Sequence, residues 1–252
     1  MFGKLMLGVA AAALVATPAS ARQKNHTAQG YALPADKPVT ILLMRPDMEV
    51  GEMQAGGLIE PNADWTKAAR EHLAKALQAS HTARNIELKT LDPSADSEQL
   101  INDYEALHRA VADAIITYKY YGAKLPTKKD KFDWTLGPDA RKLGEASGAN
   151  YALFFYGRDN FASAGRKAVQ VAGFLGCLIG VCVIAGGGQH VYYASLVELS
   201  TGNVVWFNIQ RGSKGDVREE AGAQSMVDAV MASMPSRPGE GGVAPVAAAR
   251  KR

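Results

Sequence analysis

The apolar and polar positions of this chain follow two periods, one typical of strands and one typical of helices. Residues 39–44 and 151–156 are nearly continuous apolar runs, which predict strands that are covered on both faces. Residues 191–199 and 204–209 instead alternate apolar with polar side chains, and a Ser-Thr-Gly-Asn turn at 200–203 separates them. The pattern predicts an antiparallel hairpin at the end of the sheet.

Between these strands, apolar residues recur every three or four positions, and this spacing predicts amphipathic helices. Side chains that accept hydrogen bonds from the first turn, or glycines that tolerate a left-handed backbone, mark several of their ends. The expected helices are 63–79 (capped by Asn62), 97–118 (capped by Ser97), 138–147 (followed by Gly148) and 217–234.

The order of these elements predicts one α/β (α+β) domain over residues 38–234. We expect a mixed sheet of about five strands with helices on its faces, an apolar insertion, and then the closing antiparallel hairpin. A shorter run at 86–91 supplies one further strand of this sheet. Residues 49–54 and 58–60 are compatible with a small additional hairpin.

The N-terminus is typical of a cleavable secretion signal. Lys4 is the only charge before residue 22, residues 5–15 are apolar, and Ala19 and Ala21 satisfy the small-residue requirement of signal peptidase. We therefore expect cleavage after Ala21 and a periplasmic location, with membrane association left open. Residues 22–37 read as a flexible leader, and the Pro-, Gly- and Ala-rich residues 235–252 read as a disordered tail.

Charge and motifs exclude several classes of function. The net charge of +3 is too small and too evenly spread for a nucleic-acid-binding protein. The five histidines lie apart and form no metal-binding motif, and the chain has no nucleophile elbow and no phosphate-binding loop. We therefore expect no metal, no cofactor and no enzymatic activity.

One segment does not fit an ordinary soluble domain. Residues 168–188 carry no charge and include a Gly-x-x-x-Gly motif at 176–180. Three arrangements are open: burial in the fold or between protomers, an interfacial helix or inserted hairpin, and a membrane-spanning helix. A patch of this size needs a cover. The expected interface or membrane-contact residues are Phe174, Leu175, Leu178, Ile179, Val183 and Ile184.

The two cysteines, Cys177 and Cys182, lie in this segment. Free buried thiols are the first interpretation, because residues five apart do not share a face of a continuous helix. A local disulfide is the second, because an oxidising periplasm permits it and Gly180 offers a turn. Metal binding is the third, although no pair of histidines lies nearby.

Polar residues follow two of the expected strands and form the one ligand-site hypothesis. Arg45 and Asp47 come just after the first strand, and Arg158 and Asp159 come just after the strand at 151–156. If these strands are parallel neighbours, the four side chains meet at the carboxyl edge of the sheet, where α/β folds place ligands. Solvated loop ends are the alternative.

The end of the domain resembles a known family. The strand at 151–156 and the pattern of residues 190–206, with its Ser-Thr-Gly turn and Trp206, are similar to a periplasmic α/β superfamily. That superfamily includes the curli secretion channel subunit, the lipoprotein activators of peptidoglycan synthases and the N-terminal domain of TolB. The resemblance covers residues 39–234 by element order. It implies an envelope scaffold that binds proteins, although this chain has no lipid-bearing cysteine after its cleavage site.

Together these features predict a secreted protein of the bacterial cell envelope with a non-catalytic binding or assembly role. The segment 168–188 would serve self-association, or contact with an envelope partner or a membrane. The alternative is a periplasmic enzyme or small-ligand sensor with its site at the sheet edge near Arg45 and Arg158.

Overall fold

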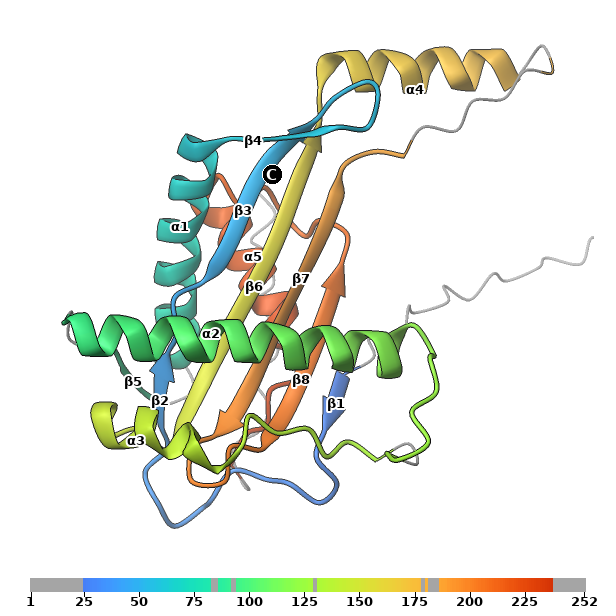
Figure 1. Cartoon of the computed structure of the whole chain (residues 1–252). Coiled ribbons are helices and arrows are strands. Elements are labelled where there is room, and N and C mark those ends of the chain that lie inside the picture. Colours follow the sequence, from blue (N-terminus) through green and yellow to red (C-terminus); the bar gives the residue numbers. More distant parts are fainter. Residues whose placement is uncertain are drawn as a thin grey trace, which may run out of the picture.

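The computed structural model describes residues 25–82, 86–91, 94–128, 131–177, 180 and 186–237. The expected signal peptide, at residues 1–21, and residues 238–252 of the expected tail lie outside these ranges. The described chain is an α/β domain built on one mixed sheet, as the sequence pattern predicts (Figure 1).

The sheet has eight strands, three more than expected, because residues 25–27 and the hairpin of 47–53 and 59–61 also join it. The main path runs β1-β8-β7-β6-β2-β5, while β3 pairs with β6 and β4 pairs with β3. The strands are β1 (Asn25–Thr27), β2 (Thr40–Leu43), β3 (Asp47–Met53), β4 (Ile59–Pro61), β5 (Glu87–Lys89), β6 (Tyr151–Ala162), β7 (Gln189–Glu198) and β8 (Val204–Arg211).

The long strand β6 organises the sheet. Its first part pairs in parallel with β2, and its second part pairs in parallel with β3. The break between β2 and β3 contains Pro46, which has no N–H to give to a ladder of hydrogen bonds. The compatible hairpin at 49–54 and 58–60 is present as the antiparallel pair β3–β4.

The closing hairpin is confirmed. Strands β7 and β8 are antiparallel, and a tight turn at 200–203 joins them. Gly202 in this turn has φ of +74°, and a Cβ at this position would lie 1.9 Å from the carbonyl oxygen of Gly137. The turn therefore needs glycine for its backbone angle and for the close approach of the neighbouring loop.

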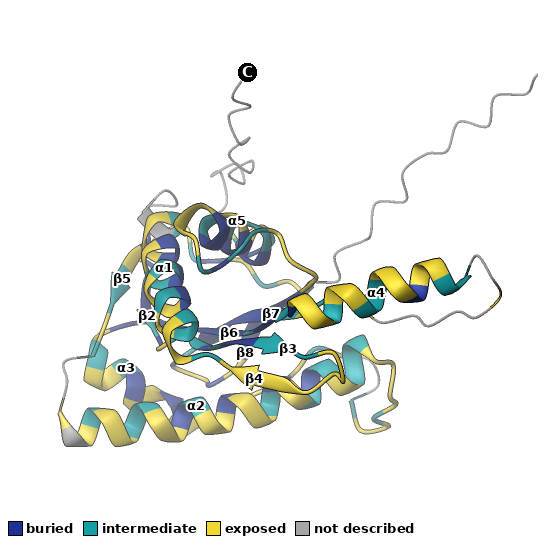
Figure 2. Cartoon of the chain, turned by 90° about the horizontal axis from the view of Figure 1, so that it is seen from above, coloured by how far each residue is buried: buried dark blue, intermediate teal, exposed yellow. Residues whose placement is uncertain are grey.

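Helices cover both faces of the sheet (Figure 2). Alternate side chains of β6 serve the two layers: Leu153 and Phe155 lie in the core with α1 and α5, and Ala152 and Phe154 lie in the core with α2 and α3. The α-helices are α1 (Ala63–Thr82), α2 (Ala95–Ile115), α3 (Arg141–Ser147), α4 (Ala164–Cys177) and α5 (Glu220–Met231). A π-turn (Ile116–Tyr120) extends α2, and a 3₁₀ turn (Pro138–Ala140) precedes α3.

Of two expected caps at helix N-termini, one is confirmed and one is wrong. The Asn62 side chain accepts the backbone N–H of Trp65 at 2.9 Å, as expected for the start of α1. The expected cap of α2 is wrong by three residues. Ser94 is the cap, and Ser97 is the reciprocal partner whose hydroxyl accepts the Ser94 backbone N–H.

The leader expected at residues 22–37 is not free of the domain. Residues 25–27 form β1, which pairs with β8, and Leu33 is buried in the core of the α1 and α5 layer. The Tyr31 hydroxyl donates to the Tyr151 hydroxyl at 2.7 Å. The polar composition of residues 22–37 does not reveal these contacts, because only a few side chains hold this extended segment against the domain.

Candidate functional site

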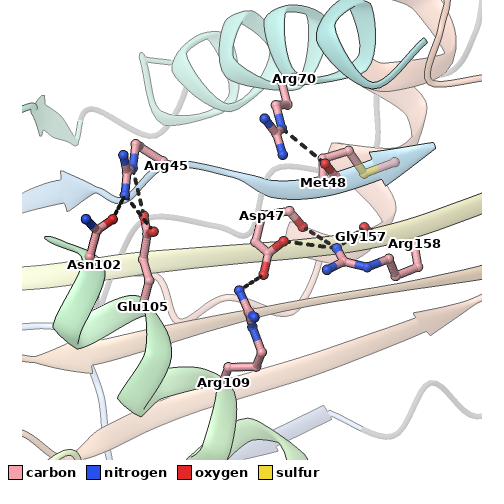
Figure 3. A network of polar contacts seen from close by, with 9 residues as sticks. All are labelled: Arg45, Asp47, Met48, Arg70, Asn102, Glu105, Arg109, Gly157 and Arg158. Atoms are coloured by element: carbon pink, nitrogen blue, oxygen red, sulfur yellow. Dashed lines mark hydrogen bonds and ion pairs between the residues drawn. The ribbon is translucent and has the colours of Figure 1, made fainter. Parts of the chain in front are cut away.

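The predicted site residues Asp47 and Arg158 do meet, on the face of the sheet that α2 covers (Figure 3). Arg158 donates from Nη1 to Asp47 Oδ1 at 3.0 Å, and Arg109 of α2 donates from Nη2 to Asp47 Oδ2 at 2.5 Å. The Arg158 guanidinium also lies 4.3 Å from the ring centre of Tyr156. One carboxylate therefore joins two arginines from different elements.

Arg45 belongs to a separate part of this network. Its guanidinium forms an ion pair with Glu105 of α2 at 2.9 Å and donates to the side-chain oxygen of Asn102. These contacts tie the segment after β2 to α2 (Figure 3). The space beside this network is about 20 Å³, which is room for about one water molecule.

Asp159 lies apart from the other three residues, on the opposite face of the sheet. The expected strand end at residue 156 is wrong, because β6 continues to Ala162 and its side chains alternate between the faces. Asp159 is fully buried and accepts hydrogen bonds from the Tyr192 hydroxyl and from His190 Nδ1. Sequence reasoning placed the four residues at one edge, and the structure places them on two faces of a continuing sheet.

Under the arginine network lies a buried polar pair that sequence reasoning missed. His108 Nε2 forms a hydrogen bond with the Ser195 hydroxyl, and the imidazole stacks on Phe154 with ring centres 3.9 Å apart. Burial lowers the pKa of His108 to about 3, and the charge of Arg109 adds to the shift. Both side chains are buried, so the pair holds α2 on the sheet.

The buried imidazole makes stability depend on pH. The unfolded chain takes up this proton near pH 6.5, whereas the folded chain takes it up only near pH 3, so the free energy of unfolding falls as pH falls through this window. We expect His108 to remove about 2 kcal/mol between pH 7 and pH 5. Urea unfolding at both pH values tests this. The variant His108→Gln should show a loss smaller by about that amount, and an equal loss would contradict the assignment.

The second candidate surface is the apolar helix α4. It projects from the end of β6, away from the sheet and the other helices (Figures 1 and 2), and of its residues only Gly173 is buried. Val171, Phe174 and Leu175 are 61%, 68% and 56% exposed. Of the expected arrangements, burial within the fold alone is therefore wrong for the described part, while burial between protomers stays a prediction.

Arg166 connects the N-terminal end of α4 to the rest of the domain. Its Nε donates to the Gly186 carbonyl at 3.0 Å, and its Nη1 donates to the Ala55 carbonyl at 3.2 Å. The first bond holds the chain returning to β7, and the second holds the turn between β3 and β4. The end of that turn and the start of β4 carry two more exposed apolar side chains, Leu58 and Ile59. The apolar surface therefore combines α4 with the β3–β4 hairpin.

At the far end of α4, Cys177 is disulfide-bonded. The first interpretation, a free buried thiol, is therefore wrong for this residue. The remaining predicted residues of this segment lie outside the described ranges. These residues are Leu178, Ile179, Cys182, Val183 and Ile184.

Neither a metal centre nor a membrane span occurs in the described part of the chain. Across those residues, no three His, Cys, Asp or Glu side chains are grouped so that they could hold a metal ion. None of the described helices combines the length and the apolar character needed to cross a bilayer.

No protein-family model matches the chain, and no curated protein matches it. Among solved structures it is similar to the PelC dodecamer from Paraburkholderia phytofirmans, with 11% identity and a TM-score of 0.36 over 82% of this chain and 96% of that one. It is also similar to lipoprotein GNA1162 from Neisseria meningitidis, with 14% identity and a TM-score of 0.33 over 77% and 96%. Likenesses of this strength carry no conclusion about function, and membership of the periplasmic superfamily stays a prediction.

Proposed function

We propose that this chain is a secreted, non-catalytic protein of the bacterial cell envelope that assembles with further copies of itself through α4. The observation that carries the proposal is the exposure of Val171, Phe174 and Leu175 on a helix that stands away from the body. Burying a side chain of this kind stabilises a complex by roughly 1.5–3 kcal/mol. Three such apolar side chains on one helix face therefore strongly favour association.

The composition of α4 favours a protein partner over a lipid surface. A helix that lies in a membrane interface opposes its apolar face with a strongly charged one. In α4 the only charged residues, Arg166 and Lys167, are in the first turn, and small uncharged residues recur every three or four positions beside the bulky stripe. They are Gly165, Ala168, Ala172 and Gly176. Small residues in this spacing let a second helix approach closely.

The disulfide at Cys177 supports the proposed compartment. Disulfides persist in oxidising environments such as the periplasm and are rare in the cytoplasm. The secretion signal expected at residues 1–21 leads to the same compartment. Two independent features, one at the N-terminus and one at the end of α4, thus agree on a location outside the cytoplasm.

Fractionation of the native mature protein tests the proposal. We expect alkaline carbonate to release it from membranes, and we expect light scattering on the released protein to give a mass of several chains. A soluble monomer at micromolar concentration would contradict self-assembly. Retention in the membrane after carbonate would contradict a protein partner for α4 and would assign that helix to the bilayer.

A further inference from the structure

A hollow lies far from α4, at the end of the sheet where β6 begins and β7 ends. Its volume is about 590 Å³, within the range of about 300–1,000 Å³ typical of small-molecule sites. The segment from Tyr31 to Pro38 forms one wall, and α3 forms another (the segment crosses below the strands in Figure 1). Tyr151, Ala149 and Leu199 are the buried residues of its lining.

Four charged side chains line this hollow, and only two of them pair with each other. Arg141 and Glu145 form an ion pair along α3, with Nε and Oε1 3.8 Å apart. Glu198 and Lys37 form no ion pair with any described residue, although both line the same space. Glu198 is half-buried and accepts one hydrogen bond, from the Thr201 hydroxyl to Oε2 at 2.7 Å. The hollow thus offers one unpaired carboxylate and one unpaired ammonium group.

Two tyrosines complete the lining beside Glu198. Burial raises the pKa of both Tyr31 and Tyr151, and the charge of Glu198 acts in the same direction on each. Both phenols therefore stay protonated, and each ring offers an apolar face. The Tyr151 oxygen accepts the Tyr31 proton, so the Tyr151 hydroxyl keeps its own proton to donate.

We propose that this hollow binds a small zwitterion, with its ammonium group on Glu198 and its carboxylate on Lys37. A free α-amino acid and a short peptide share this chemistry. The ammonium group would replace the missing cationic partner of Glu198 and lie against the two tyrosine rings, where cations are stabilised. This site is independent of assembly through α4, because it lies at the opposite end of the sheet (Figure 1).

Titration calorimetry on the mature full chain tests the site with four probes. Glycine and the dipeptide alanyl-alanine carry both charges, whereas acetate and ethylammonium carry one each. We expect at least one zwitterion to bind, and each single-charge probe to bind about tenfold more weakly or worse. Tighter binding of glycine would identify amino acids as the ligand class, and tighter binding of the dipeptide would identify peptides. No heat from either zwitterion at about 10 mM would overturn the proposal.

Matched variants locate the binding. Glu198→Gln keeps an oxygen for the Thr201 hydroxyl and the shape of the side chain, so we expect it to fold and to weaken zwitterion binding about tenfold. Lys37→Met should weaken binding in the same direction. Glu71→Gln removes an exposed carboxylate of α1 that does not line the hollow, and we expect it to change affinity less than about twofold. Equal affinities of Glu198→Gln and the unaltered protein would overturn the assignment.

Discussion

Replacing both Phe174 and Leu175 by glutamate is expected to convert the assembled protein into monomers. The two side chains are 68% and 56% exposed in the single chain, so their replacement removes no contact from its core. In an assembly they would be buried, and a buried unpaired carboxylate costs several kcal/mol. Light scattering should therefore report the mass of one chain, while the melting temperature of the domain changes little.

A matched control separates this effect from a general gain in solubility. Leu107 is 41% exposed and belongs to a different helix, α2, so Leu107→Glu adds one negative charge, against two in the double variant, at an unrelated apolar position. We expect this variant to keep the mass of the assembled protein. If Leu107→Glu dissociates the assembly while the double variant keeps it intact, the interface lies on α2 and not on α4.

The second large effect concerns two neighbouring residues on β6 that sequence reasoning had grouped together. Asp159→Ala should lower the free energy of unfolding by about 3 kcal/mol, because it leaves the buried Tyr192 hydroxyl and the His190 N–H without their acceptor. Arg158→Ala should lower it by about 1 kcal/mol or less, because this side chain is 26% exposed and its ion pair is partly screened by water.

Urea unfolding of the two variants at neutral pH measures both values. We expect the two losses of unfolding free energy to differ although the residues are adjacent. The Asp159 side chain is buried in the layer under α1 and α5, whereas the Arg158 side chain is partly exposed to solvent near α2. Equal losses would contradict the assignment of Asp159 as the buried acceptor of both hydrogen bonds. The same comparison shows whether the arginine network stabilises the fold at all.

Patterns of neighbouring residues predicted most of the helices and strands, because the interactions that favour these elements are between residues close together in the sequence. The runs at 39–44 and 151–156, the hairpin around the turn at 200–203 and the start of α1 at Asn62 are all present. The errors are local as well. Ser94 and Ser97 both suit a cap, and only the hydrogen bonds of α2 decide between them. The leader has a disordered composition, yet β1 and Leu33 fasten it.

The candidate surfaces were less predictable, because they depend on where strands end and what covers them. Sequence reasoning found Asp47 and Arg158 but not their partner Arg109, which comes from a helix 62 residues along the chain from Asp47. It found the apolar segment but left open whether the fold, a second protomer or a membrane covers it. The hollow around Glu198 carried no local signal, because its lining comes from four separate parts of the chain.

The sequence alone predicted the α/β architecture, which the structure confirms, and identified the unusual apolar segment, while the secretion signal stays a prediction. These predictions rest on the periodicity of apolar residues, on small residues at a cleavage site and on an absence of charge. Each can be made from a short stretch of sequence. Only the tertiary structure decided that Arg158 and Asp159 serve opposite faces, that α4 stands exposed, and that Glu198 and Lys37 share a hollow. The physical reason is that exposure and pairing depend on distances between segments far apart in the chain, and hydrophobic patterning leaves those distances unspecified.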